Sequence, residues 1–75
     1  DEALTVYRRL IAERPGDRKL DRAYLGAGRA MLQKERCETA AWHYLVAAVD
    51  LAQSSEVAED ARRYMKMIEK TEAGD

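Results

Sequence analysis

The 75-residue chain contains no phenylalanine and only one proline, one cysteine and one histidine. A single cysteine cannot close an internal disulfide, and one cysteine with one histidine falls short of the ligand set of a structural zinc site. β-Branched residues are few, whereas alanine, leucine, arginine and glutamate are frequent, as is typical of an all-α protein. We therefore expect the fold to depend on helix packing or on association.

The sequence also lacks a transmembrane run, a signal peptide and an initiator methionine. Its most apolar stretch, residues 39–52, would form a helix about 21 Å long, which is too short for a bilayer core of about 30 Å. We expect the chain to be a fragment of a longer protein, so that a targeting segment would lie outside it. One unpaired cysteine favours a reducing compartment such as the cytoplasm, and nothing else indicates a localisation.

Charge is unevenly distributed along a chain whose net charge is −1. Residues 18–36 contain six basic and two acidic residues, a net charge of +4, while the segments on either side are acidic. A sequence pI near 5.8 argues against a dedicated nucleic-acid-binding protein. The basic segment nevertheless keeps RNA binding open as an alternative, which a steep salt dependence of any RNA affinity would support.

The spacing of apolar residues predicts four helices in a single domain covering residues 1–75. Pro15 and Gly16 end the first helix, Asp17 can cap the second, and Ser54 and Ser55 can cap the fourth. Gly26 and Gly28 fall inside the second helix, where we expect close packing against a neighbouring helix to compensate their low helix propensity. The predicted helices span residues 1–14, 18–34, 38–53 and 55–70.

The predicted inner faces follow the apolar spacing of each helix. The third helix is apolar nearly all round, which is typical of a helix covered on several sides. The expected inner residues are Leu4, Tyr7, Leu10 and Ile11 in the first helix, Leu20, Tyr24, Ala27, Met31 and Leu32 in the second, Ala40, Tyr44, Ala47 and Leu51 in the third, and Val57, Ala58, Ala61, Met65 and Ile68 in the fourth. Residues 71–75 are expected to fray.

One spacing recurs through the helices. It reads Ala3-x3-Tyr7-x2-Leu10 closed by Pro15, then Tyr24-x2-Ala27-Gly28-x2-Met31, then Ala40-x3-Tyr44 with Ala47, and finally Ala58-x2-Ala61-x3-Met65. The pattern resembles the tetratricopeptide repeat (TPR), with Tyr24 and Ala58 one family period of thirty-four residues apart. Alanine stands where the family has leucine before Gly28, Met31 replaces a tyrosine, and no proline closes the third helix. A generic helical bundle is the alternative.

The resemblance implies an all-α, four-helix antiparallel α-hairpin stack of about one full repeat with a half unit on each side. Such domains are protein–protein interaction scaffolds, and their A helices line a concave face that binds peptides. In this chain the face would contain Arg22, Leu25, Gly26, Arg29, Leu32 and Gln33 from the second helix, and Glu56, Glu59, Asp60, Arg63 and Met67 from the fourth. Arg22 and Arg29 are two turns apart and can hold carboxylates; the alternative is an ordinary solvated face.

A second candidate surface lies on the third helix. If Ala40, Tyr44, Ala47 and Leu51 form its inner face, then Trp42, Val46 and Val49, with Leu45 nearby, point outward as an apolar stripe. Tryptophan is enriched among residues that dominate binding energy, and an exposed stripe of this kind would be unusual on a small monomer. It predicts docking against a second copy of the chain as a homodimer, against a partner, or against the rest of a longer parent protein, unless the first or fourth helix covers it.

Catalysis has little support in the sequence. His43 has no carboxylate at helical spacing in its immediate neighbourhood, and Cys37, next to Arg36, has no resolving cysteine and takes a semi-buried packing position in the TPR pattern. No phosphate-binding loop or metal-ligand pattern is present. We therefore predict a non-enzymatic protein that needs no cofactor and has a protein or peptide as its partner. The basic set for the RNA alternative is Arg18, Lys19, Arg22, Arg29, Lys34 and Arg36.

Overall fold

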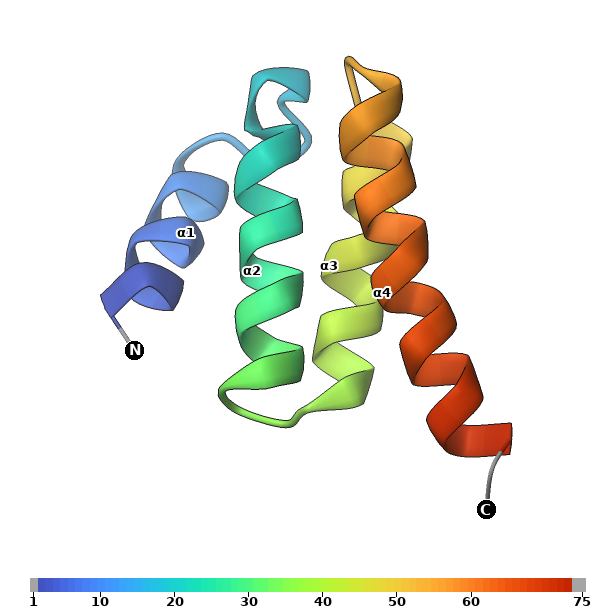
Figure 1. Ribbon diagram of the computed structural model, residues 1–75. Helices are drawn as coiled ribbons and strands as arrows, with labels where there is room; N and C mark the ends of the chain where they lie inside the picture. The colour runs from blue at the N-terminus through green and yellow to red at the C-terminus, as the bar shows by residue number, and fades with distance from the viewer. Residues whose placement is uncertain (1, 74–75) are drawn as a thin grey trace.

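The computed structural model describes residues 2–73, and this part of the chain is all-helical. Four α-helices and one short 3-10 helix make up the regular structure of these residues (Figure 1). The fold class expected from composition and spacing is confirmed at this level. The elements are α1 (Glu2–Glu13), η1 (Arg18–Leu20), α2 (Asp21–Gln33), α3 (Glu38–Leu51) and α4 (Ser55–Ala73).

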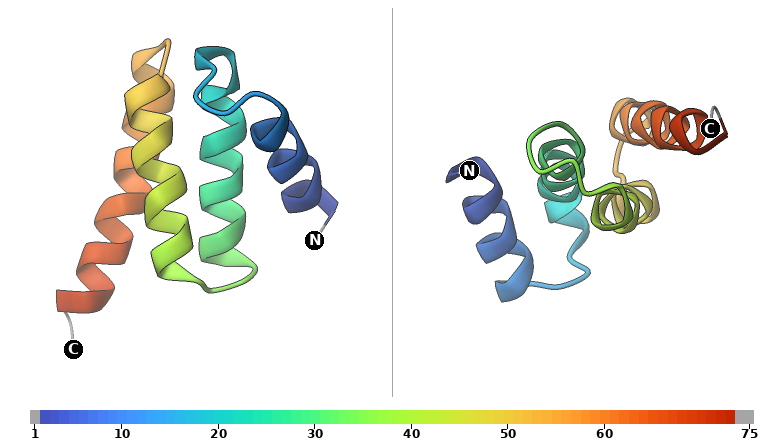
Figure 2. Two further views of the ribbon diagram at one scale, coloured as in Figure 1. Left: turned by 180° about the vertical axis from the view of Figure 1, so that it is seen from behind. Right: turned by 90° about the horizontal axis from the view of Figure 1, so that it is seen from below.

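The helices pack side by side with successive helices in opposite directions from α2 to α4 (Figures 1 and 2). Helix α2 contacts α1, α3 and α4, and α3 also packs against α4. Viewed along the helices in Figure 2, α3 lies to one side of the line joining α2 and α4. Helices α2 and α4 therefore share one broad face of the molecule, with α3 behind them.

Local chemistry explains where the helices begin and end. Gly16 has a positive φ of 76°, and Asp17 Oδ1 accepts a hydrogen bond from the Lys19 N–H at 2.9 Å, which caps η1. Ser54 Oγ accepts from the Val57 N–H at 3.4 Å at the start of α4. Thr71, which was expected to fray, is helical, and its hydroxyl donates to the Met67 carbonyl. Residues 74 and 75 lie outside the described residues.

Helices α2 and α3 pack closely against each other at Gly28. A Cβ atom on Gly28 would lie 2.7 Å from Leu45 Cδ2 and 3.3 Å from the Ala41 carbonyl oxygen. Leu45 is 0 % exposed and lies between Ala41 and Ala48, which are also fully buried. The expected reason for a glycine at this position, a close neighbouring helix, is confirmed.

The predicted inner face of α3 is wrong by one residue. Ala40, Tyr44, Ala47 and Leu51 are half-buried, while the fully buried line is Ala41, Leu45 and Ala48. One residue corresponds to a rotation of about 100° around the helix axis. The rotation lets Leu45 fill the space above Gly28, and it leaves a half-buried apolar flank on each side of the buried line. Helix α3 is therefore apolar on its buried line and on both flanks, which is why its sequence shows no single apolar stripe.

Smaller departures concern the outer helices. Gly26, expected on the concave face, is buried against α1, because a Cβ there would lie 2.5 Å from Tyr7 Cζ. Leu10, expected to be inward, is 39 % exposed, while Leu4 is buried. In α4, Val57, Ala61 and Ile68 are buried as expected, whereas Ala58 and Met65 are only half-buried.

Two polar contacts connect the helix ends. The Asp21 carboxylate is 6 % exposed; Oδ1 accepts from the Arg22 N–H at 2.8 Å and Oδ2 accepts from the Gln53 N–H at 3.0 Å. It therefore joins the start of α2 to the connection between α3 and α4. Tyr24 accepts a hydrogen bond from the Gly16 N–H through its hydroxyl, and its ring centroid lies 6.4 Å from that of Tyr44.

Candidate binding surfaces

The broad face shared by α2 and α4 contains most of the residues predicted to bind a partner. Along α2, Arg22, Arg29 and Gln33 are exposed and Leu25 and Leu32 are half-buried. Their spacing of three and four residues puts all five on one side of the helix. The side opposite them is the buried one, which packs against α3.

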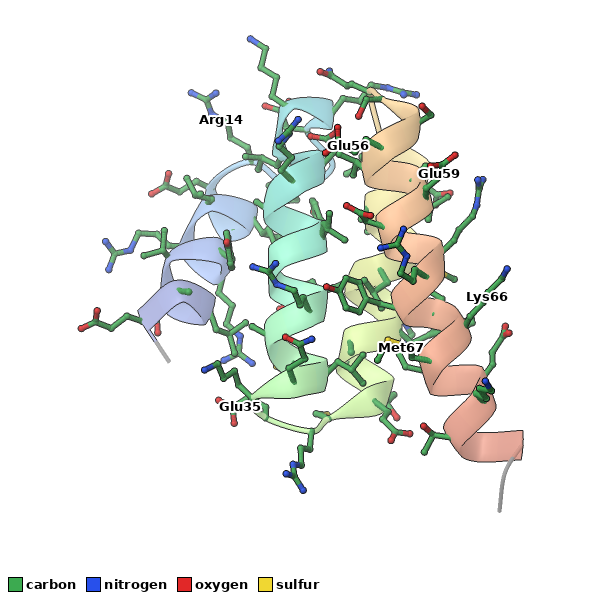
Figure 3. All side chains as sticks on the ribbon, in the orientation of Figure 1. Arg14, Glu35, Glu56, Glu59, Lys66 and Met67 are labelled. Atoms are coloured by element: carbon green, nitrogen blue, oxygen red, sulfur yellow. The ribbon has the colours of Figure 1, made fainter. Side chains whose placement is uncertain are left out.

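Helix α4 contributes apolar and charged groups to the same face. Met67 is 48 % exposed, and its side chain lies at the edge of α4 nearest α2 (Figure 3). Arg63 is exposed and forms a long ion pair with Asp60, with 3.8 Å between Nη1 and Oδ1. We define the α2–α4 face by the residues Arg22, Leu25, Arg29, Leu32, Gln33, Arg63 and Met67.

Two residues expected on this face lie elsewhere. Gly26 is covered by Tyr7 of α1. Glu59 points away from α2 (Figure 3), whereas Glu56 lies near the gap between α2 and α4. Glu59 instead lines an outward hollow of about 340 Å³ together with Arg62, Arg63 and Lys66. The α2–α4 face is therefore less acidic on its α4 side than the sequence suggested.

Arg22 and Arg29 are free to bind an anionic group. Among the side chains that the structure describes, residues 2–71, the ion pairs are those of Arg14 with Asp17 and of Arg63 with Asp60, so neither Arg22 nor Arg29 is paired there. Seven helical residues separate their backbones by about 10.5 Å. Such a spacing is close to that of two side chains three positions apart in a polyproline II peptide, which rises about 3.1 Å per residue and returns to the same face every three residues.

The predicted apolar stripe of α3 is only partly accessible. Leu45 is fully buried, so its assignment to an exposed interface is wrong. Trp42, Val46 and Val49 are half-buried, and Trp42 and Val49 pack against the core cluster. The one-residue rotation of α3 explains the difference, because it turns Leu45 into the core and moves the other three onto a flank.

A pocket that the sequence did not predict lies beside this flank. Its volume is about 400 Å³, and it is lined by Glu38, Thr39, Trp42 and His43 of α3 and by Ile68 and Glu69 of α4. The fold thus brings two carboxylates near His43, where helical spacing alone indicated none. Glu38 lies five residues before His43, outside helical spacing from it but one turn before Trp42, and Glu69 is brought in only by the packing of α4 on α3.

The remaining candidates are exposed and dispersed. Cys37 is a free, exposed thiol, not semi-buried as expected. The basic residues of the RNA alternative are all exposed, but Arg18 and Lys19 lie in η1 while Lys34 and Arg36 follow the other end of α2. Among the described residues there is no group of three potential metal ligands, and no helix there is long and apolar enough to cross a membrane.

Comparison with known proteins identifies no relative: no family model matches the chain, and no curated protein or solved structure is significantly similar to it.

Proposed function

We propose that this chain is a TPR-like interaction module, a non-enzymatic scaffold that binds a partner protein through the α2–α4 face. The observation that carries the proposal is the exposed side of α2. It presents two unpaired arginines two turns apart, with the half-buried Leu25 and Leu32 beside them. Apolar burial would supply affinity, and the arginines would select the partner by charge.

Three features of the packing support the TPR-like part of the proposal. Helices α2 and α4 lie on one face with α3 behind them (Figure 2). A glycine of α2 packs closely against α3, and α4 contacts both helices of the preceding hairpin. The one-residue rotation of α3 departs from the quoted repeat spacing, so the proposal rests on the arrangement of helices more than on the individual repeat positions.

The partner segment that fits this face is a peptide in the extended polyproline II conformation with two carboxylates about 10 Å apart, a distance covered by three residues, which also brings both side chains to one face. Arginine binds carboxylates through two parallel N–H donors, which gives geometric specificity as well as affinity. Apolar side chains between the two acidic residues would contact Leu25, Leu32 and Met67.

The test uses a fluorescein-labelled peptide with two glutamates three positions apart and leucines between them. Its affinity for the chain is measured by fluorescence anisotropy at low ionic strength, since salt screens such contacts. Arg22→Gln with Arg29→Gln should weaken binding at least tenfold, because hydrogen bonds to charged groups are worth about 1.5–3 kcal/mol and a tenfold change in affinity corresponds to about 1.4 kcal/mol.

The matched control removes two arginines from other surfaces, Arg9→Gln with Arg62→Gln, so that net charge changes equally. Arg9 and Arg62 are exposed on α1 and α4. The control should bind within about twofold of the unmodified chain. Equal losses in both variants would mean that only net charge attracts the peptide, and the proposed site would be wrong.

A further inference from the structure

The pocket between the N-terminal end of α3 and the C-terminal half of α4 has the chemistry of a cation-binding site. Ile68, which is 3 % exposed, is its apolar wall, and half-buried Trp42 supplies an aromatic surface. Glu38 and Glu69 approach from different helices. A volume of about 400 Å³ is near the lower end for small-ligand sites, which span about 300–1,000 Å³.

Both carboxylates of this pocket are uncompensated. Among the described side chains of residues 2–71, the ion pairs involve Asp17 and Asp60, not Glu38 or Glu69, and no side-chain hydrogen bond there uses either glutamate. Lys66 lies three positions before Glu69 on α4, but it lines the outward hollow with Glu59, Arg62 and Arg63 and not this pocket. The pocket therefore has two unpaired negative charges beside an indole ring.

Helix dipoles do not change the sign of this charge. Glu38 is in the first turn of α3, at the positive end of its dipole, while Glu69 is in the last part of α4, near the negative end. Because the two ends have opposite sign and lie together, their effects on a bound ion oppose each other. The carboxylates and the ring then determine which ligand is favoured.

We propose that this pocket binds the guanidinium group of an arginine from a protein partner. Tryptophan is the best aromatic partner for a cation, and the planar guanidinium stacks on its face. Glu38 and Glu69 would accept the guanidinium N–H groups, and the Thr39 hydroxyl offers a further acceptor. No residue of α2 lines the pocket, so this site is separate from the α2–α4 face and does not depend on the function proposed for that face.

The chain has one tryptophan, so its fluorescence reports on this pocket directly. We would titrate the chain at low salt with the peptide acetyl-Gly-Arg-Gly-amide and, in parallel, with the same peptide containing citrulline, which keeps the shape of arginine but has no charge. The arginine peptide should give a saturable change in Trp42 fluorescence at millimolar concentration, and the citrulline peptide should give none. Equal responses to the two peptides would overturn the proposal.

A variant pair locates the site. Glu38→Gln with Glu69→Gln should raise the dissociation constant of the arginine peptide at least fivefold, whereas Glu56→Gln with Glu59→Gln, which removes the same charge elsewhere on α4, should change it less than twofold.

NMR chemical shifts of the backbone amides and the indole should change at Trp42 and Ile68 when the arginine peptide is added to the unmodified chain. Shifts confined to other acidic residues, or equal losses in the two double variants, would show non-specific attraction and overturn the proposal. Unchanged NMR dispersion in each variant confirms that it remains folded.

Discussion

At the residue scale, the packing around Gly28 leaves no room for one additional carbon atom. Leu45 is wholly buried above it, and the Ala41 carbonyl belongs to the α3 backbone, so neither neighbour can move far. At Gly26 the nearest atoms belong to the outer end of the half-buried Tyr7 ring, which can rotate outward. Two glycines of one helix thus differ in what an added methyl group would displace.

Gly28→Ala should lower the free energy of unfolding by up to about 2 kcal/mol, because overpacking typically costs about 1–3 kcal/mol and alanine returns about 1 kcal/mol of helix propensity. Gly26→Ala should change it by less than about 1 kcal/mol, since the same propensity gain offsets a movement of Tyr7. Urea denaturation followed by circular dichroism measures both. A Gly28→Ala chain that is more stable than the unmodified one would contradict the close approach of α2 and α3.

Asp21 is a second residue whose role depends on tertiary contacts. Its carboxylate is buried with no cationic partner in the described residues, and two backbone N–H groups satisfy its oxygens. One of these donors is Gln53, thirty-two positions away. A buried polar group of this kind is costly unless hydrogen-bonded, so Asp21 couples the position of the α3–α4 connection to the start of α2.

At the scale of elements, helix α3 organises the molecule, since it packs against both α2 and α4. Its buried line of Ala41, Leu45 and Ala48 has half-buried flanks on both sides. The flank with Tyr44 lies near Tyr24 of α2, and the flank with Trp42 borders the pocket shared with α4. The rotation of this one helix therefore determines both the core and the pocket.

Two leucines of α3 test the rotation. Leu45→Ala should cost about 2–5 kcal/mol, as expected for a fully buried leucine, and this approaches the whole net stability of about 3–5 kcal/mol for so small a core. Leu51→Ala removes the same atoms from a half-buried position and should cost about half as much. In thermal unfolding followed by circular dichroism, Leu45→Ala should be largely unfolded at 25 °C and Leu51→Ala folded. The reverse order would favour the face first expected from the sequence.

The whole molecule is flat, with extents of 37 × 27 × 15 Å. Its radius of gyration of 11.7 Å is close to the value of about 11 Å for a compact chain of this length. Large hydrophobic side chains that are well exposed among the described residues are Val6 and Leu10, one turn apart on α1, and Met67 on α4. Leu45 is buried and Trp42, Val46 and Val49 are half-buried, so the α3 flank exposes less apolar surface than an open stripe would, whereas a dimer interface usually buries about 800 Å² on each partner.

Sedimentation equilibrium over a wide concentration range should accordingly give the monomer mass of 8.5 kDa. A dimer would contradict this and would favour self-association through Trp42, Val46 and Val49. In that case Trp42→Glu should restore the monomer mass, because it would bury a charge in the interface. A Trp42→Glu chain that stays dimeric would move the interface to another surface.

The sequence by itself determined the helical class and the approximate helix limits, since these depend on local properties. Composition favours helices, Pro15 and Gly16 interrupt them, and Asp17 and Ser54 accept hydrogen bonds at helix starts. The exposed side of α2 was also predictable, because a helix with one polar side has a clear period.

Only the tertiary structure decided the rotation of α3 and the residues that meet around Trp42. Helix α3 is apolar on three sides, so its spacing fits more than one inner face, and the space above Gly28 selects Leu45. The pocket combines Glu38 and Glu69, thirty-one positions apart, and Gly26 and Glu59 leave the expected face for the same reason. Each of these features depends on how one helix is rotated relative to another. The fit of side chains between the helices sets that rotation, and no local sequence pattern contains it.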